Sequence, residues 1–573
     1  MIPSDPAHTD GSPDLPTTRK SKRDLILFIV AFWLTSFAIY PQFPAHYFRD
    51  QQHRMVEDSE TVLLGRLQEG NYYLTEAEAI EMALRNNLNI QVERHLPLIA
   101  EWSLEQSRAV YDPSTFFNFN WDRQRTPTTS ALQGGDSLTE IFTTYESGYR
   151  QDFSTGTSFE FNVTGSRNRT TNFFASLNPA IASGFEILFR QNLLEGFGRI
   201  GADYQIEISR NNLDISQEAF RNQVSQIILQ VQQAYWDLRL ALENIRVQEA
   251  ALEAARALLD QNQARFEVGS AARLEVVQSE AEVALREEEL VRAQYNYRRL
   301  QDQLVRLISN YETPNQFPGE IIPADVADPS QVRVNESYEE LLAIAREMRP
   351  ELQQADLDIE NRRIELQSSR NQLRPNLDLV AGYQQFGLGG TRIIRDFSGG
   401  FSDPVIIDII PGGIDDSLNQ LFSSDFYGYV LGLNLELPIF NTDARAQNAR
   451  AQLAHEQSQF SRKSLEQAVA LQVQDALNQI EMNQASLRAG LTAVRAAQER
   501  LDSEQARFDV GVGTTRELIE AQRDLLQAES VLVRARTALM KSRAQLHFAV
   551  GRTFEANNIS LSDALSMNVR SPN

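Results

Sequence analysis

The same long pattern occurs twice in this chain. At a constant offset of 242 residues, the stretch from Leu229 to Ile308 aligns without a gap with the stretch that begins at Leu471. Within it, "QARFEVG" from Gln263 matches "QARFDVG" from Gln505. A second offset, of 262 residues, aligns "MALRNNLNI" with "IAREMRPEL" and extends the likeness toward the N-terminus. Because a repeat of this length marks a supersecondary unit used twice, the sequence predicts a duplicated fold. Each half is expected to run helix, strand region, long helix, turn and long helix.

Apolar residues recur every seven positions around two Val-Gly turns, and this spacing is typical of coiled-coil packing. From Asp203 to Val268 nothing interrupts the pattern, so this helix is predicted to be about 100 Å long at 1.5 Å per residue. Gly269 and Gly511 suit the left-handed position that ends a helix. Each half is therefore predicted to contain a long helical hairpin. The sevenfold positions are Leu252, Leu259, Phe266, Val276, Val283, Leu290, Tyr297 and Leu304, matched by Val494, Leu501, Phe508, Leu518, Leu525, Leu532, Leu539 and Leu546.

The segments ahead of the hairpins alternate between apolar and small or polar residues. Such strict alternation over about eleven residues suits a tilted membrane strand, although a soluble sandwich shows the same pattern. Weaker runs begin at Ser114, Thr157 and Pro375, and an additional hairpin is expected to turn at Gly156. The strongest run places on one face, expected to meet lipid, Tyr427, Tyr429, Leu431, Leu433, Leu435 and Leu437.

The strand number then argues for assembly. Four to six strands are expected, which are too few to close a barrel, and open strand edges are not tolerated in lipid. Several copies would therefore have to share one barrel.

Composition excludes several functional classes. The formal net charge is -23, which disfavours a nucleic-acid partner, and the absence of cysteine removes disulfides and thiolate sites. The six histidines are scattered without ligand spacing, and "GLGG" at Gly387, expected in a surface loop after a strand, precedes no predicted helix. We therefore expect no metal, no cofactor and no enzymatic activity.

The N-terminal region carries a targeting signal. Four basic residues between Arg19 and Arg23 precede sixteen mostly apolar residues from Leu25 to Tyr40. A sixteen-residue helix rises only about 24 Å, less than a bilayer core of about 30 Å. The segment is read as a signal peptide with a cleavage site at Ser36 and Ala38, and the alternative is an uncleaved anchor.

From about Leu74 to Gly551 the chain resembles the TolC-like outer-membrane efflux protein (OEP) family. The resemblance rests on the duplicated order of "LTEAEAIEMALRNNLNI", "NLLEGFGR", "PIFNTDAR" and the two "ARF(E/D)VG" turns. It implies a mixed α and β membrane protein in which three copies share a β-barrel in the outer membrane of a Gram-negative-type bacterium. Their coiled-coil hairpins would form a periplasmic tunnel. The implied partners are two further copies, outer-membrane lipid, a periplasmic adaptor (membrane fusion) protein and an inner-membrane pump.

The resemblance also implies site residues near the hairpin turns. Glu517 and Glu520 match the acids that line the family's aperture, and Glu275 and Gln278 hold the corresponding places in the first half. The family's closing basic residue falls on Gly513 here, so Arg516 is the nearest candidate for a closed-state contact. Adaptor docking is implied for the two tips, which lack the family's leucine and consist of Val268, Gly269 and Ser270 and of Val510, Gly511 and Val512.

The implied function is an exit duct of a tripartite efflux or type I secretion system. The alternative is a periplasmic coiled-coil scaffold or adaptor that spans no membrane. Expected boundaries are a leader and signal peptide or anchor at 1–40, a linker at 41–71, a first repeat at 72–310, a second linker at 311–334, a second repeat at 335–553 and a tail at 554–573. Within the repeats we expect strands at about 114–193 and 375–438, and hairpins at about 200–310 and 441–551.

Overall fold

The computed structural model describes residues 63–64, 66–68, 70–128, 136–398 and 404–566. The predicted signal peptide at 1–40 lies outside these residues, as does most of the first linker. The described chain divides into a sheet unit, formed by Tyr111–Leu193 and Leu377–Leu435, and a helical unit formed by the remainder. Among the described helices, none combines the length and the apolar character that crossing a membrane requires.

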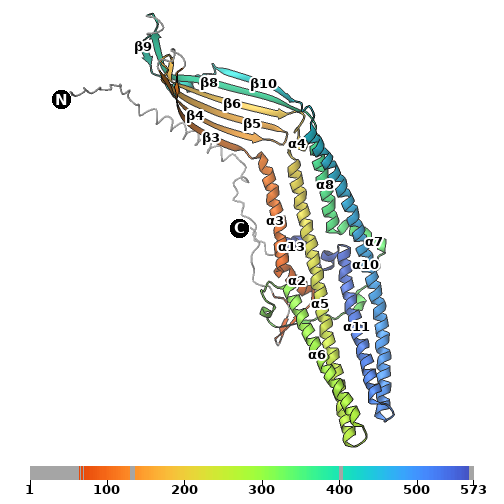
Figure 1. The fold of residues 1–573 in the computed structure, drawn as a ribbon. Coiled ribbons are helices and arrows are strands. Elements are labelled where there is room, and N and C mark those ends of the chain that lie inside the picture. The colour runs from red at the N-terminus through yellow and green to blue at the C-terminus, as the bar shows by residue number, and fades with distance from the viewer. Residues whose placement is uncertain (1–62, 65, 69, 129–135, 399–403, 567–573) are drawn as a thin grey trace, which may run out of the picture. The chain divides into compact units, whose positions relative to one another are not determined.

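Four very long helices dominate the helical unit, in two hairpins (Figure 1). The first pairs α5 (Tyr204–Glu267) with α6 (Arg273–Ile308), and the second pairs α10 (Thr442–Asp509) with α11 (Thr515–Ala549). The two hairpins end and resume at positions that match at the offset of 242. Of the sevenfold positions, all but Phe266 are buried or half-buried. The remaining elements of this unit are α2 (Glu76–Asn86), α3 (Leu88–Arg108), α4 (Arg199–Ala202), α7 (Tyr338–Met348), α8 (Pro350–Asn371), α12 (Thr553–Ala556), α13 (Leu561–Ser566) and a small sheet of β1 (Arg66–Gln68), β2 (Asn71–Leu74) and β7 (Glu320–Pro323).

The prediction of a single helix ahead of each strand region was wrong, because two helices precede it in each half. Asn87 separates α2 from α3, and its side chain accepts hydrogen bonds from the Asn89 and Ile90 amides. Arg349, which corresponds to Asn87 at the offset of 262, separates α7 from α8. There the break comes from Pro350, since a residue before proline is disfavoured in helical conformation. Both halves thus break at corresponding positions, although a side-chain cap marks the first break and a proline causes the second.

The main core of the helical unit lies where the small sheet meets the middle of the long helices. Trp236, Tyr235 and Phe220 are almost fully buried there. The Tyr235 hydroxyl donates to the Leu74 carbonyl at 3.0 Å, which ties α5 to β2. The long helices are therefore anchored at one level by a conventional apolar core.

Seven strands form the sheet unit, in the order β10-β8-β6-β5-β4-β3, with β9 paired to the end of β8. The number exceeds the expected four to six because the first half supplies four strands. The additional hairpin is β4 and β5, with Gly156 at its turn (φ 78°). The strands are β3 (Ser114–Pro127), β4 (Ser137–Asp152), β5 (Thr157–Thr170), β6 (Leu177–Asn192), β8 (Asn376–Asp396), β9 (Val405–Ile410) and β10 (Tyr427–Glu436).

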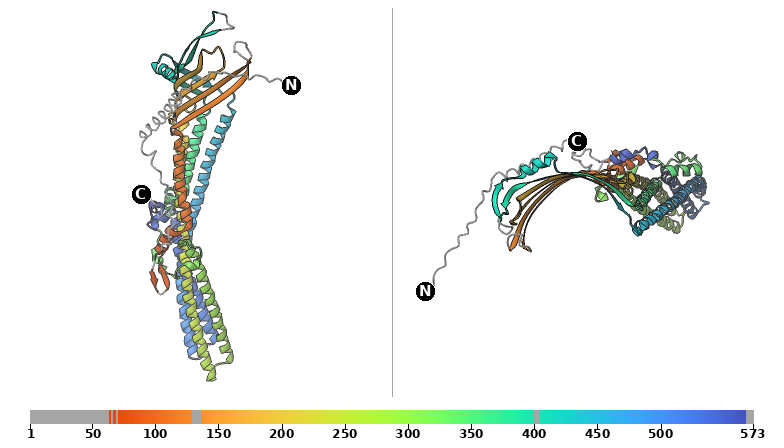
Figure 2. Two further views of the ribbon diagram at one scale, coloured as in Figure 1. Left: turned by 90° about the vertical axis from the view of Figure 1, so that its left-hand side faces the viewer. Right: turned by 90° about the horizontal axis from the view of Figure 1, so that it is seen from above.

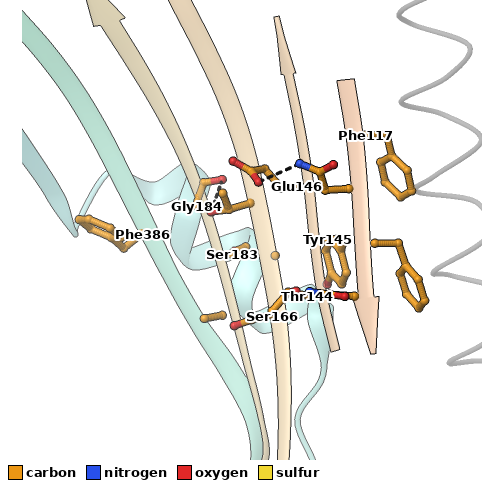
Figure 3. Close-up of a pocket in the computed structure, with 14 residues that line it drawn as sticks. Phe117, Thr144, Tyr145, Glu146, Ser166, Ser183, Gly184 and Phe386 are labelled. Atoms are coloured by element: carbon orange, nitrogen blue, oxygen red, sulfur yellow. Dashed lines mark hydrogen bonds between the residues drawn. The ribbon is translucent and has the colours of Figure 1, made fainter. Parts of the chain in front are cut away.

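Side chains at even and odd positions lie on opposite faces of this sheet. Asn118 pairs with Glu146, Glu146 with Thr164, Thr164 with Gly184 and Gly184 with Phe386, so even positions share a face across β3 to β8. The sheet is strongly curved (Figure 2, right). Its even face is concave and encloses a hollow of about 840 Å³ (Figure 3). The odd face is the convex one.

A short helix, α9 (Ile414–Ser423), packs on the odd face at the "GLGG" stretch. The prediction that this stretch is a surface loop was wrong, since Gly387–Gly390 lie inside β8. Side chains there would collide with the helix: a Cβ on Gly387 would lie 1.9 Å from the Ser417 carbonyl oxygen, and one on Gly389 would lie 2.4 Å from that of Gly413. The glycines therefore allow α9 to approach the sheet backbone.

Candidate functional site

The tips of the two hairpins are built alike. After α5 the chain passes through Gly269 (φ 77°), and after α10 through Gly511 (φ 81°). In each tip the next amide bonds back into the helix end: Ser270 donates to the Arg265 carbonyl at 2.8 Å, and Val512 to the Arg507 carbonyl at 3.0 Å. This is the left-handed helix ending that the Val-Gly motif predicts. The residues predicted to dock an adaptor are exposed, with Val268 at 78% and Val510 at 74%.

Glu517 and Glu520 lie on the first turns of α11, and both carboxylates have partners in the same chain. Glu517 closes a capping box: its Oε2 accepts from the amide and the hydroxyl of Thr514, both at 2.9 Å. These hydrogen bonds, the backbone one foremost, lower the pKa of Glu517. Arg516, the candidate closing residue, donates from Nε to Glu520 at 3.0 Å. The side chains of Arg516 and Glu520 are exposed, and Glu517 is half-buried.

Glu275 differs from its counterpart Glu517 because it reaches the other hairpin. The cap position of α6 is Ala272, which has no side-chain oxygen, so Glu275 keeps only a 3.5 Å bond from the Ala272 amide. Its Oε2 accepts from the Thr515 hydroxyl of α11 at 3.0 Å. Gln278, one turn further along α6, is exposed. The four acidic or amide positions predicted for an aperture therefore differ in their surroundings within one chain.

A buried polar cluster under the tips joins α5, α6 and α11, and the sequence reasoning missed it. The fully buried Asn262 amide donates to the Ser279 hydroxyl at 2.7 Å, and Ser279 donates to the Glu275 carbonyl at 3.0 Å. The Thr515 hydroxyl lies 3.5 Å from the Asn262 Oδ1. An asparagine inside the sevenfold pattern was the available signal, since a polar residue buried there commonly fixes register.

A second missed contact lies two turns further along α6. Glu282, 5% exposed, accepts from Arg286 of the same helix at 2.9 Å and forms an ion pair with Arg523 of α11. Burial raises the pKa of Glu282, but the hydrogen bonds from Arg523 and Arg286 outweigh it and lower the pKa overall. Arg286 also pairs with Glu289 at 2.6 Å. A charge cluster thus joins the two hairpins.

An apolar contact supports the same junction. Phe508 at the end of α10 is buried with Leu258 of α5 and with Leu518 and Ile519 of α11. The Arg265 guanidinium lies 4.6 Å from the centre of the Phe508 ring, which is a cation–π distance.

The predicted lipid-facing residues lie on or just beyond β10. Tyr427, Tyr429, Leu431, Leu433 and Leu435 occupy the odd face of this strand, whereas Leu437 follows the end of the strand. All six are exposed, Leu431 at 81%. The Tyr429 ring lies 5.3 Å from the ring of Tyr383 on β8, so the aromatic surface continues onto the neighbouring strand.

The concave face has the opposite character. In the hollow of Figure 3, Asn118 donates to Glu146 at 3.3 Å, and Thr144, Thr164 and Ser166 surround them. Acidic residues outnumber basic residues on this face of the strands. The acids are Asp122, Glu140, Glu146, Asp152, Glu160, Glu186 and Asp378, and the bases are Arg150 and Arg190. The sheet unit therefore has a polar, acidic inner face and an aromatic outer face. In the described part of the chain, no group of three or more His, Asp or Glu residues is arranged to hold a metal ion.

Known proteins share this sequence pattern and this fold. The sequence profile of the family described as "Outer membrane efflux protein" matches residues 160–310 and 341–552. The outer membrane protein TolC of Vibrio cholerae is 24% identical over 304 residues, which are 52% of this chain and 60% of that relative's length. Among solved structures, the Campylobacter jejuni CmeC outer membrane channel superposes with a TM-score of 0.58 at 14% identity, covering 88% of this chain and 94% of that one. The Neisseria gonorrhoeae MtrE outer membrane channel gives 0.56 at 18% identity, covering 88% and 97%.

Proposed function

Since the chain belongs to the outer membrane efflux protein family, we propose that three copies form a channel whose shared β-barrel crosses the outer membrane. Members of the family are outer-membrane proteins with a periplasmic part, and this chain is placed there with them. The observation that carries the proposal is the two-faced sheet: an aromatic convex face suits lipid, and an acidic concave face suits a water-filled lumen.

The two edges of the sheet support closure by identical copies. Among the described residues, no strand pairs with the outer edge of β3 or with that of β10, and in the antiparallel order these two strands run in opposite directions. The β3 edge of one copy therefore fits the β10 edge of the next as an antiparallel pair. Six strands from each of three copies give eighteen. At a spacing of about 4.8 Å and a tilt of about 40°, such a barrel is roughly 35 Å across between backbones, in the range of barrels with an open aqueous lumen.

The helical unit supplies the gate in this proposal. Three pairs of hairpins would surround the axis, and Glu517 and Glu520 from each copy would form an acidic ring at the tips, with Glu275 and Gln278 beside it. The contacts of Glu275, Glu282 and Phe508 between the two hairpins of one chain would hold the closed state. Opening would come from a periplasmic adaptor engaging the Val-Gly tips, driven by an inner-membrane pump. Substrate passes without chemical change, so no enzymatic step is assigned.

We propose as substrates the solutes that a pump delivers through a tripartite efflux or type I secretion system, because a barrel of this width would admit them. The alternative of a periplasmic scaffold is disfavoured because a soluble protein rarely exposes an aromatic surface as large as the convex face.

Purification of the full chain in detergent tests the proposal. We expect a trimer by mass measurement and stepwise single-channel currents after insertion into planar bilayers. A stable monomer that gives no current in lipid would refute the channel. Recovery of the mature chain in the soluble periplasmic fraction would favour the scaffold.

A further inference from the structure

Four arginines gather on the convex face at one end of the sheet. Arg123 and Arg125 are at the end of β3, and Arg167 and Arg169 are at the end of β5. This end is opposite to the strand ends at which the chain enters from and returns to the helical unit. All four occupy odd positions and all are exposed. We refer to them as the arginine quartet.

The pairing register brings the quartet together across β4. Arg123 and Arg169 both pair with Ile141, one from each side, and Arg167 pairs with Thr143 in the next row, opposite Trp121. Two strands at a spacing of about 4.8 Å separate the Arg123 and Arg169 backbones by about 10 Å. Arginine side chains are long enough to converge over that gap, and only Thr139, Ile141 and Thr143 lie between them on this face. The space between Arg123 and Arg169 can therefore hold a group the size of a phosphate, which guanidinium groups bind through two parallel hydrogen bonds.

Charge is separated by face in this part of the sheet. Every acid of β3, β4 and β5 occupies an even position and lies on the concave face: Asp122, Glu140, Glu146, Asp152 and Glu160. Among the described residues, no carboxylate forms an ion pair with any of the four arginines, and Arg125 donates to the Ser137 hydroxyl at 3.1 Å. In a chain with a net charge of -23, this concentration of unneutralised positive charge attracts anions from outside the chain.

The level of the quartet relative to the apolar band identifies the source of that anion. On β3 the odd face reads Phe117, Phe119 and Trp121 before Arg123, and each of these rings is exposed. On β5 it reads Phe159, Phe161, Val163 and Gly165 before Arg167, so Arg167 lies about 26 Å along the strand from Phe159 at about 3.3 Å per residue. Aromatic girdles mark the edges of the apolar band of membrane barrels, and arginine on the lipid face is tolerated near the interface rather than at the midplane. The quartet thus lies at headgroup level.

We infer that the arginine quartet is a binding site for the phosphate groups of anionic glycolipids in the outer leaflet, which it holds against the convex face beside Trp121. This inference rests on the proposed function, because it takes the convex face as the lipid-facing one. The occupant is a lipid headgroup rather than free phosphate, since the aromatic band directly beside the quartet would accept the acyl chains.

The test uses the full chain in dodecyl maltoside micelles doped with diphosphoryl lipid A. Native mass spectrometry counts the lipid retained after washing. We expect the variant R123Q/R125Q/R167Q/R169Q to retain at least about tenfold less lipid than wild type, because it loses several charge-assisted bonds to phosphate. The matched control, R150Q/R190Q, removes arginines from the concave face and should stay within about twofold of wild type. Dephosphorylated lipid should be retained poorly by the wild type, and inorganic phosphate should not displace the bound lipid.

Equal retention by the quadruple variant, an equal loss in the control, or equal retention of dephosphorylated lipid would overturn the inference. So would displacement by inorganic phosphate. If the quadruple variant fails to fold, the pairs R123Q/R125Q and R167Q/R169Q are measured instead. Single-channel current is recorded on the same wild-type preparation. A preparation without current would refute the channel, whereas the lipid count would still report on the arginines.

Discussion

Phe508 and Phe266 occupy the same place in the two halves of the chain, 242 residues apart, yet Phe508 is 1% exposed and Phe266 is 45% exposed. Phe508 is covered by Leu258, Leu518 and Ile519 of its own chain. Since the halves are duplicates, the first-half tip of one copy should meet the second-half tip of the next in the proposed trimer. Phe266 would there gain the kind of cover that Phe508 has already.

The two phenylalanines should therefore respond differently to truncation. Phe508→Ala should lower the free energy of unfolding of the single chain by about 3 kcal/mol, the usual cost of removing a buried ring. Phe266→Ala should change it by no more than about 0.5 kcal/mol and should instead weaken the trimer. Urea unfolding followed by circular dichroism in detergent measures the first effect, and mass measurement under dilution measures the second. Equal effects on both quantities would contradict this view of the tips.

Glu282 should make the junction of the hairpins sensitive to pH. Its folded-state pKa is lowered by Arg523 and Arg286 despite burial. The stabilisation is therefore complete above the pKa of an unfolded glutamate, about 4.3, and is lost as the pH falls through the lower folded-state value. We expect thermal stability to decrease below about pH 4 in the wild type.

The variant Glu282→Gln should cost about 2 kcal/mol at pH 7, less than a fully buried pair because Arg523 is half exposed, and should lose most of this pH dependence. The control Glu287→Gln breaks an exposed pair with Arg256 and should cost no more than about 0.5 kcal/mol. Thermal melts of both variants between pH 3 and pH 7 make the comparison. A wild-type acid transition that persists unchanged in Glu282→Gln would assign the effect to another group.

Much of the helical unit could be predicted because its signals are periodic and duplicated. The hairpins, their Val-Gly turns and the length of α5 follow from spacing alone. The paired helices ahead of the strands were missed because Asn87 breaks the first through a side-chain cap that does not interrupt the apolar pattern. The contacts of Glu275 and Glu282 with α11 were missed for another reason. Periodicity identifies which face of a helix is buried, but it does not say which residue of a distant helix lies opposite.

The close approach of α9 to β8 gives a steric prediction. Gly387→Val would place a Cβ within 2 Å of the Ser417 carbonyl oxygen, so α9 must move away from the sheet. We expect a loss of roughly 2–3 kcal/mol, as for other overpacked sites, and new protease cleavage between residues 411 and 426. Gly432→Val in β10 is the matched control, because its Cβ would meet nothing within 4 Å. Limited proteolysis of both variants decides, and equal cleavage of the two would show that α9 is not held by this contact.

The acidic ring proposed at the tips predicts a cation effect. Glu517→Gln together with Glu520→Gln should weaken block of single-channel current by divalent cations, since six carboxylates would be neutralised in the trimer. Glutamine preserves the capping box that Glu517 forms with Thr514, so the tip should keep its fold. Glu499→Gln, an exposed acid on α10, is the control and should leave the block unchanged. Undiminished block in the double variant would remove both residues from the aperture.

The sheet was predicted less completely than the helices. The run from Tyr427 to Leu437 was predicted as one alternating face, and β10 carries it as far as Leu435. The hairpin predicted at Gly156 is present. The arginine quartet was not, because Arg123 and Arg169 come together only through their shared partner Ile141 on β4. The glycines at 387–390 were assigned to a loop because the sequence gives no sign that a helix returns to cover them.

The helix α9 also affects how readily the chain aggregates before it assembles. β10 pairs with β8 only up to Phe386, whose amide donates to the Phe426 carbonyl. β9 pairs with β8 from Arg392 onward. Between them the Leu388 amide donates to the Gln420 side chain of α9 at 2.7 Å. Without α9, this stretch of backbone would be open to any extended peptide during transit through the periplasm, and newly made chains would be prone to stack into fibrils. The ten residues of α9 thus shield this part of β8 from pairing with another chain.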